Sequence, residues 1–385
     1  MEKLPTSLLS LFRSPLTNHL PFFGLAEIFL ARKSGKEDES VYSFMTRHFG
    51  RKTAETLMDA MISGIYAGNI HNLSVRSCFK VLYDMEQKDR SIVLSVLKSA
   101  LAGLTSKKTD LAKELRTDEC KHLVGATGIS FVDGMQTLTD RLTEKINETD
   151  EVVVATKITA MEPCPAEESS ANAIRLHLQR GDGATDTIDA DLVFSTVPIK
   201  SLFDTLPPNL SKHICELNES IKHVSVGVIN LGYSKESLPY NGFGHLVPSN
   251  QWEGILGMIY DSLVFPKQLK GDSGSTLTVM IGGANAPDKA RLSEKDMVKF
   301  ACEKVEEHLG ISSKPDVALA TPHFYCIPQY PVGHHRRMTD ALAHLKTDFP
   351  QLEVLGNNFY GVGIADSIAN AKRVAKEAAQ KAQKS

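Results

Sequence analysis

The chain has 385 residues, of which 42% are hydrophobic and 23% are charged, and its formal net charge is −3. These values are typical of a folded protein with enough apolar material for two or three domains. The near balance of 43 basic and 46 acidic residues argues against a broad nucleic-acid-binding surface. The six cysteines are scattered and form no C-x-x-C pair, a pattern that predicts reduced thiols and no zinc site.

The first hundred or so residues have the apolar spacing of helices. Seven apolar residues in 53–66 fit the i, i+3, i+4, i+7 pattern of a helix with one buried face: Ala54, Leu57, Met58, Met61, Ile62, Ile65 and Tyr66. Ser74 is placed to cap a following helix. The earlier segment 16–30 is rich in Leu and Phe, but Pro21 and Glu27 interrupt it, so it is not a membrane-spanning helix. We predict that this segment packs in the core rather than lying on a membrane surface.

From about residue 125 onward, strand and helix patterns alternate. A Gly181-Asp182-Gly183 turn predicts a hairpin between the second and third strands, and a helix is predicted over 200–217. Antiparallel hairpins inside a partly parallel plan indicate a mixed α/β fold. The predicted strands cover 152–158, 173–178, 192–196, 224–231, 254–260 and 276–281.

Near the end of the chain, a short apolar run over 352–355 leads through Gly361 and Gly363 to a helix that begins near Ala365. Glycines let the backbone approach a ligand closely, and a helix start offers free N–H groups and a positive dipole end. Such a site suits a phosphate or an electron-rich carbonyl. An ordinary strand-to-helix turn is the alternative, and the residues alone favour it. The helix is predicted to bury a stripe made of Ile364, Ile368, Ala371 and Ala375.

Familiar catalytic motifs are absent from the sequence. It contains no H-E-x-x-H, no G-x-S-x-G, no P-loop and no G-x-G-x-x-G dinucleotide fingerprint. Glycine-flanked apolar segments remain, and they suit a large flat pocket for a hydrophobic planar ligand. Core strands with glycines at their bends are the alternative, which chemistry alone favours. The segments contain Gly64, Phe243, Gly244, Ile259, Met280 and the 361–363 turn.

Several longer segments resemble the protoporphyrinogen oxidases of the eukaryotic type, a family within the flavin amine-oxidase superfamily. The resemblance extends over essentially the whole chain in order. The segments that carry it are 44–50, 64–69, 73–79, 230–233, 242–249, 257–262, 326–330 and 356–368.

This resemblance implies an enzyme that uses FAD to oxidise protoporphyrinogen IX to protoporphyrin IX, with dioxygen as the acceptor, in the penultimate step of haem biosynthesis. It implies peripheral association with the mitochondrial inner membrane and a possible homodimer. The implied fold is the α/β amine-oxidase-like fold with three parts. These are a helical membrane-associated domain (1–124), an FAD domain in two pieces (125–220 and 331–385) and a β-rich substrate domain (221–330).

The resemblance also assigns residues. Those expected to contact FAD are Ile158, Asn357, Val362, Gly363 and Ile364, and the helix dipole after the last of them is expected to stabilise the reduced flavin. Those expected to line the porphyrinogen pocket are Gly64, Phe243, Gly244, Leu246, Ile259 and Met280. No catalytic side chain and no metal ligand is implied, because the cofactor carries the chemistry.

The sequence departs from the family pattern at its start. Family members begin with a βαβ unit that holds the dinucleotide fingerprint, and we expect this chain to lack that unit as an incomplete sequence. A sheet edge and apolar faces would then be left uncovered. Two alternatives stay open, namely a non-catalytic protein that binds porphyrin or a partner, and a flavin oxidase that acts on amines.

Overall fold

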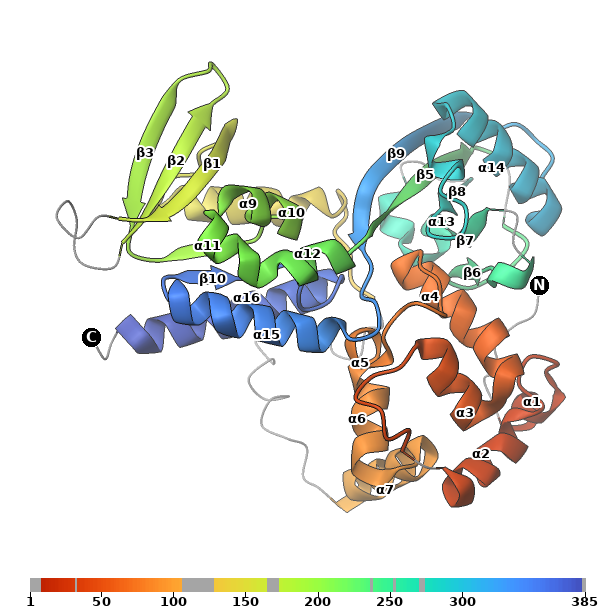
Figure 1. Cartoon of the computed structure of the whole chain (residues 1–385). Helices are drawn as coiled ribbons and strands as arrows, with labels where there is room; N and C mark the ends of the chain where they lie inside the picture. Colours follow the sequence, from red (N-terminus) through yellow and green to blue (C-terminus); the bar gives the residue numbers. More distant parts are fainter. Residues whose placement is uncertain are drawn as a thin grey trace.

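The computed structural model describes residues 8–31, 33–105, 128–164, 173–235, 238–251, 254–269 and 274–382. Helices and strands are mixed, as predicted. Figure 1 shows three regions: the first helices at lower right, a five-stranded sheet at upper right, and the remaining strands and helices at left. The chain crosses between the left and right regions at the start of strand β5 (His223–Tyr233) and at the end of strand β9 (Val317–Pro328).

The helical region begins the chain, and its predicted helix over 53–66 is confirmed. The helix is continuous with the preceding one through a π-helical segment, and Ser74 caps the next helix by accepting a hydrogen bond from the Ser77 N–H at 2.9 Å. The elements are α1 (Leu8–Arg13), α2 (Leu20–Leu30), α3 (Val41–Thr53), η1 (Ala54–Met58), α4 (Asp59–Tyr66), α5 (Val75–Cys78), α6 (Lys80–Asp89) and α7 (Ile92–Thr105).

Helix α2 exposes large apolar side chains and buries an acidic one, the reverse of the usual amphipathic helix. The prediction that this segment packs in the core is therefore wrong. Phe29 is 81% exposed and Phe22 is 74% exposed, whereas Glu27 is only 3% exposed. The reason is that the buried Glu27 faces the region, beside the half-buried Phe23, so Phe22 and Phe29 are turned outward. A sequence pattern gives the apolar stripe but not the direction in which it points.

Glu27 makes this contact at the start of α7. One carboxylate oxygen accepts hydrogen bonds from His48 Nδ1 at 2.8 Å and from the Ile92 N–H at 2.6 Å, and the other accepts from the Val93 N–H at 3.2 Å and from the Ser91 hydroxyl. A side chain of α2 therefore caps α7, where free N–H groups and the helix dipole both favour a negative charge. Glu27 thus joins α2 and α7, two helices with exposed apolar side chains, to the rest of the helical region.

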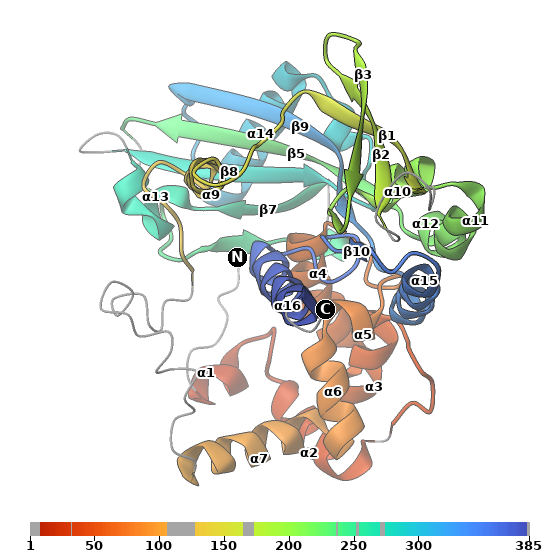
Figure 2. The same cartoon turned by 90° about the vertical axis from the view of Figure 1, so that its left-hand side faces the viewer.

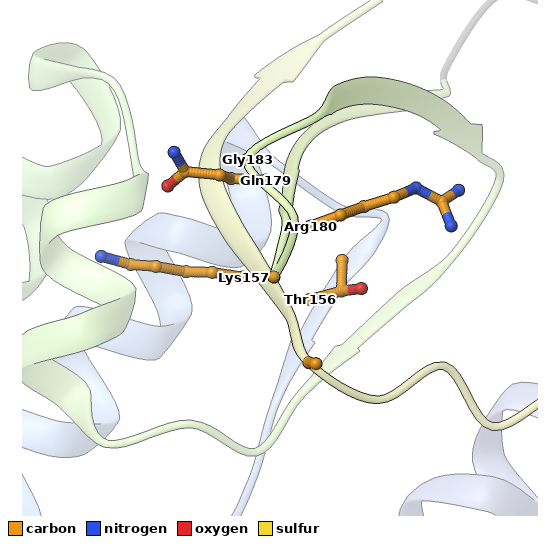
Figure 3. A pocket seen from close by; sticks show the side chains of 7 residues that line it. Thr156, Lys157, Gln179, Arg180 and Gly183 are labelled. Carbon is orange, nitrogen blue, oxygen red and sulfur yellow. The ribbon is translucent and has the colours of Figure 1, made fainter.

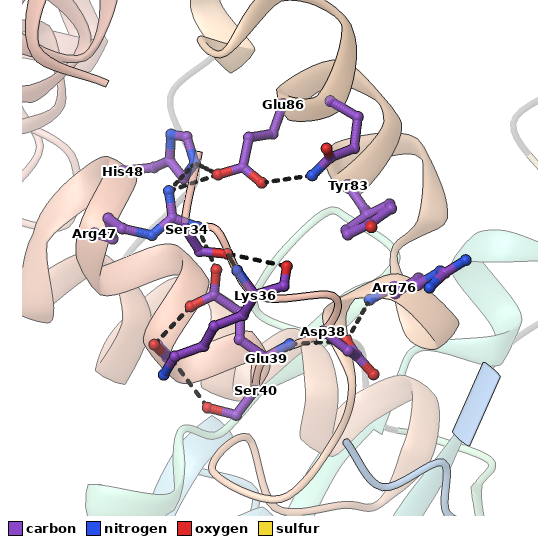
Figure 4. Close-up of polar contacts among 12 residues, drawn as sticks. Ser34, Lys36, Asp38, Glu39, Ser40, Arg47, His48, Arg76, Tyr83 and Glu86 are labelled. Atoms are coloured by element: carbon purple, nitrogen blue, oxygen red, sulfur yellow. Dashed lines mark hydrogen bonds and ion pairs between the residues drawn. The ribbon is translucent and has the colours of Figure 1, made fainter. Parts of the chain in front are cut away.

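His48 continues this polar network toward the surface. Figure 4 shows His48 and Arg47 converging on Glu86, and Arg47 also reaching Glu39. The Arg47–Glu86 distance is 2.6 Å, and Glu86 is buried. The charged groups of the network are paired with one another, which is how buried charges are normally accommodated.

The left region of Figure 1 combines an antiparallel sheet with a short parallel pair. The predicted turn at Gly181–Gly183 connects β2 to a strand that the sequence patterns miss, Thr185–Ala190. The strand predicted over 192–196 is therefore not the partner of β2 in this hairpin; it forms the parallel pair with a strand near the end of the chain. The strands are β1 (Thr156–Pro163), β2 (Ile174–Arg180), β3 (Thr185–Ala190), β4 (Val193–Ser195) and β10 (Leu352–Val354).

Helices pack around this pair and form one core with it. The helix predicted over 200–217 is divided, because Pro207 and Pro208 cannot continue a helix interior. The helices of the region are α9 (Gln136–Ile146), α10 (Ile199–Thr205), α11 (Pro208–Ser211), η3 (Lys212–Ile214), α12 (Cys215–Ser220), α15 (His334–Asp348) and α16 (Ile364–Ala382).

The predicted buried stripe of α16 is wrong. Ile364 is 54% exposed and Ile368 is 47% exposed, because the helix turns Asn370 and Val374, which are one turn apart, toward the protein instead. The β4–β10 pair has only two strands among the described residues, although parallel strands are normally part of larger, covered sheets.

The β-rich region is a single antiparallel sheet with the strand order β6-β7-β8-β5-β9. Helix α14 (Glu294–Leu309) covers one face, and Ser293 caps it by accepting a hydrogen bond from the Asp296 N–H at 3.2 Å. The strands are β5 (His223–Tyr233), β6 (Gly244–Leu246), β7 (Ile255–Ile259), β8 (Ser275–Gly282) and β9 (Val317–Pro328). The short elements between them are η4 (Ser249–Gln251), α13 (Asp261–Val264), η5 (Pro266–Gln268) and η6 (Lys289–Arg291).

Candidate functional site

The register of the β-rich sheet places four of the six predicted porphyrinogen-lining residues on one face. Gly244 pairs with Ile259, which pairs in turn with Thr278 of the next strand. In the adjacent row Leu246 pairs with Gly257, and Gly257 pairs with Met280. Directly paired residues, and residues two apart along a strand, share a face. We call this the open face; it lies opposite α14, which packs on the alternate residues.

The other two predicted residues lie at the edge of the open face. A Cβ atom added to Gly64 would come within 2.6 Å of Leu246 Cδ2, so α4 packs directly against β6 at this glycine. Phe243, which directly precedes β6, is 64% exposed. The structure therefore brings five of the six predicted residues together where α4 meets the sheet, and Phe243 adjoins them only through its place in the chain before Gly244.

Helix α4 contributes two further apolar side chains that sequence reasoning assigns to the core. Met61 and Ile65 flank Gly64 on the same side of the helix, and both are exposed. Their spacing fits the helical stripe over 53–66, so the prediction that the whole stripe is buried is wrong for these two. They enlarge the apolar surface beside Leu246.

A chain of hydrogen-bonded polar side chains lies on the open face. Asn230 pairs with Thr278 in the register and donates from Nδ2 to the Thr278 hydroxyl at 2.8 Å. Thr278 donates in turn to Asp261 Oδ2 at 2.7 Å. Burial raises the pKa of the Asp261 carboxyl. Sequence reasoning includes 230–233 and 257–262 among the family-like segments but assigns no role to these side chains.

The turn at 361–364, predicted to contact the flavin, is held by a buried tyrosine. The Gly361 N–H donates to the Tyr330 hydroxyl at 3.0 Å, and this hydroxyl donates to the Asn357 carbonyl oxygen. Tyr330 is 1% exposed, and burial raises its pKa. The neighbouring His334 stacks on Tyr330 with ring centroids 4.3 Å apart, and burial lowers the pKa of His334 to about 4. The turn therefore rests on neutral aromatic groups.

Gly361 itself requires a glycine. Its φ of 116° lies in the region that side chains avoid, and an added Cβ would come within 2.6 Å of Asp366 Oδ2. Gly363 has no such φ, and its added Cβ would lie 3.1 Å from the same oxygen. The carboxylate of Asp366 thus lies against the start of α16. Its negative charge offsets the positive helix end that the sequence suggests as the stabiliser of a reduced flavin.

The remaining predicted FAD contacts are divided between two places. Val362 packs against the core cluster of the helical region, and the exposed Asn357 accepts from Asn358 Nδ2 at 2.8 Å. Ile158 lies on β1, in a different sheet, and packs on the core that contains Val354 and Phe359. The structure therefore groups Asn357, Val362, Gly363 and Ile364 and leaves Ile158 apart from them.

Helix α4 connects the 361–364 turn with the open face. Its last residue, Tyr66, contacts the ring of Tyr330 with centroids 6.3 Å apart, while Gly64, one half-turn earlier, touches Leu246. Figure 2 shows α16 at the front, between the sheet above and helices α5–α7 below, with α4 behind it. The turn carries two glycines, and the Ile364 side chain that follows them is 54% exposed.

Two hollows lie elsewhere. The larger, about 710 Å³, is lined by His71, Lys222, Arg291 and other residues and contains none of the predicted site residues. The smaller, about 450 Å³, lies at the end of the β1–β2–β3 sheet, where Lys157 and Arg180 point in opposite directions (Figure 3). Within the described ranges, no three His, Cys, Asp or Glu side chains are grouped as metal ligands would be.

Known proteins are similar to this chain in sequence and in fold. The family model for flavin containing amine oxidoreductases matches residues 13–379. Human protoporphyrinogen oxidase is 32% identical over 384 residues, covering 97% of this chain and 76% of the human protein. Coproporphyrinogen III oxidase of Bacillus subtilis is 28% identical, covering 91% of this chain and 70% of the relative.

Solved structures of related proteins have a similar fold. A putative protoporphyrinogen oxidase from Exiguobacterium sp. superposes with a TM-score of 0.72 at 20% identity, over 98% of this chain and 76% of that one. A putrescine oxidase superposes with a TM-score of 0.60 at 14% identity, over 98% of this chain and 77% of the other. At these identities the structural similarity shows the fold alone.

Proposed function

The chain belongs to the protoporphyrinogen oxidase family of flavin containing amine oxidoreductases, and from this we propose that it is an FAD-dependent oxidase of protoporphyrinogen IX that acts in haem biosynthesis. The observation that carries the proposal is the meeting of two surfaces at α4. One is the glycine turn at 361–364, and the other is the open face with Leu246, Ile259 and Met280. A tetrapyrrole bound on the open face would lie next to a flavin bound at the turn.

In this proposal the protein binds and orients, and a bound FAD supplies the hydride acceptor, which dioxygen restores. The turn made of Val362, Gly363 and Ile364, with Asn357 beside it, would support the isoalloxazine ring, and Ile158 would contact the adenine part. Gly64, Phe243, Gly244, Leu246, Ile259 and Met280 would contact the macrocycle. Their apolar character suits a large planar ring and excludes water from it.

The test supplies the purified chain with FAD and compares three reductants in air. We expect protoporphyrinogen IX to yield fluorescent protoporphyrin IX faster than in enzyme-free buffer. Coproporphyrinogen III is the second reductant, because the Bacillus relative is named for it. Putrescine is the third; hydrogen peroxide formed from putrescine, without porphyrin formed from either porphyrinogen, would reject the proposal in favour of an amine oxidase. Binding of protoporphyrin without any oxidation would instead favour a non-catalytic porphyrin-binding protein.

We further propose that helices α1, α2 and α7 attach the protein to a membrane surface, which the family resemblance assigns to the mitochondrial inner membrane. None of the described helices is both long and apolar enough to cross a membrane. The exposed apolar side chains of these three helices support lateral attachment. They are Phe12, Phe22, Leu25, Phe29, Leu30, Val96, Leu97 and Leu101.

Replacing Phe22 and Phe29 together by serine is expected to reduce binding to lipid vesicles by more than tenfold. Each fully buried aromatic side chain contributes roughly 1.5–3 kcal/mol of transfer free energy. Co-sedimentation with phosphatidylcholine vesicles that contain an anionic lipid measures the effect. Phe324→Ser is the matched control, because Phe324 is exposed on β9, outside these three helices. Equal vesicle binding by the double variant and the wild type would reject attachment through α2.

A further inference from the structure

We propose that Asn230 binds the substrate through its amide oxygen, which accepts a pyrrole N–H of the reduced macrocycle, and that Thr278 and Asp261 position it. This inference rests on the proposed function. Asn230 lies in the same row of the sheet as Gly244, Ile259 and Thr278 and is exposed, whereas Thr278 is buried. Asn230 is therefore the outermost polar group of a chain that runs inward from the open face.

The order of donors fixes which end of the Asn230 amide points outward. A hydroxyl has a single hydrogen, and Thr278 donates it to Asp261 Oδ2 over 2.7 Å. The Thr278 oxygen is then left as an acceptor, and the amide group of Asn230 facing it at 2.8 Å has to be the donating Nδ2. Asn230 Oδ1 consequently points away from Thr278. No contact to this oxygen is recorded within the described part of the chain.

An outward acceptor on an apolar face suits a porphyrinogen better than a porphyrin. The bridging carbons of a porphyrinogen are saturated, so its pyrrole rings tilt and several of the four N–H groups can point to one side. A porphyrin is flat, and its two N–H groups lie in the ring plane, out of reach of an acceptor above the ring. A buried polar acceptor left without a donor costs free energy, so Asn230 would disfavour the product relative to the substrate.

The hydrogen-bonded series Asn230–Thr278–Asp261 could instead serve only to stabilise the sheet. The experiment separates this structural role from substrate binding. The affinities of protoporphyrinogen IX and protoporphyrin IX are measured by equilibrium dialysis of the full chain with FAD. The reduced ligand is dialysed anaerobically in the presence of dithionite, so that neither flavin nor dioxygen oxidises it. The ratio of the two affinities is the readout, because a change that only loosens the sheet lowers both affinities together.

Asn230→Leu is expected to lower the ratio of porphyrinogen affinity to porphyrin affinity by about threefold to tenfold, the usual value of one hydrogen bond. Thr278→Val is expected to lower the same ratio, because the amide is then free to turn its Nδ2 outward. Thr278→Ser keeps the hydroxyl and should restore the wild-type ratio. Thr321→Val is the matched control, since Thr321 lies on the same face in the adjacent row, paired with Val228.

Two outcomes would overturn the inference in distinguishable ways. If the wild type prefers the porphyrinogen and Asn230→Leu retains that preference, Asn230 is not the acceptor and the proposed function is unaffected. If the wild type binds neither macrocycle, the proposed function fails and the role of Asn230 fails with it.

Discussion

Gly361→Val is expected to lower the affinity of the chain for FAD by roughly 5- to 150-fold. The φ of 116° at Gly361 is one that a β-branched residue avoids, and forcing it costs about 1–3 kcal/mol. The added side chain would also collide with the Asp366 carboxylate and displace the Gly361 N–H from the Tyr330 hydroxyl. The backbone of the turn would then leave its present position. Titration of FAD fluorescence measures the affinity directly, without turnover.

Two controls show whether the loss comes from the turn rather than from strain in general. Gly310→Ala introduces a side chain at a φ of 72° with nothing within 4 Å, at the end of α14, and should leave FAD affinity unchanged. Gly363→Val should also lower FAD affinity, because its backbone is not strained but its side chain would occupy the surface proposed to support the isoalloxazine ring. A Gly363 variant that loses FAD while Gly361→Val retains it would reverse the proposed roles of the two glycines.

The features that the sequence predicts well are those with local causes. Ser74 caps a helix because a hydroxyl next to a helix start satisfies an N–H group within three residues. The glycine turn before α16 is visible for the same reason, since its geometry depends on Gly361 and its neighbours. Family-like segments then identify which of these local features belong to the candidate site.

The features that the sequence does not predict depend on contacts far apart in the chain. Thr278 and Asn230 are 48 residues apart, and only the strand register shows that they are cross-strand neighbours of Ile259 and Gly244. Tyr330 supports the Gly361 turn from 31 residues away. Strand β3 is missed because its residues are mostly exposed and polar, so no apolar alternation marks it.

Glu27→Ala is expected to destabilise the helical region by roughly 3–5 kcal/mol, the usual cost of removing one member of a buried polar network. The Glu27 and His48 side chains are both 0% exposed, so water cannot replace the lost acceptor. The variant leaves the N–H groups of Ile92 and Val93, the Ser91 hydroxyl and His48 without their shared partner. Urea unfolding measures the loss, and amide hydrogen exchange at Ile92 and Val93 locates it at the start of α7.

Glu55→Ala provides the comparison for a surface acid, because Glu55 pairs with the exposed Arg51 one helical turn away and should cost less than 1 kcal/mol. Glu27 also connects stability to the proposed membrane attachment, since it is the buried contact that points the phenylalanines of α2 outward. Glu27→Ala should therefore weaken vesicle binding as well as stability, whereas Phe22→Ser with Phe29→Ser should weaken vesicle binding alone. Normal protection of the Ile92 and Val93 amides in Glu27→Ala would show that α7 is held by its apolar contacts and not by this carboxylate.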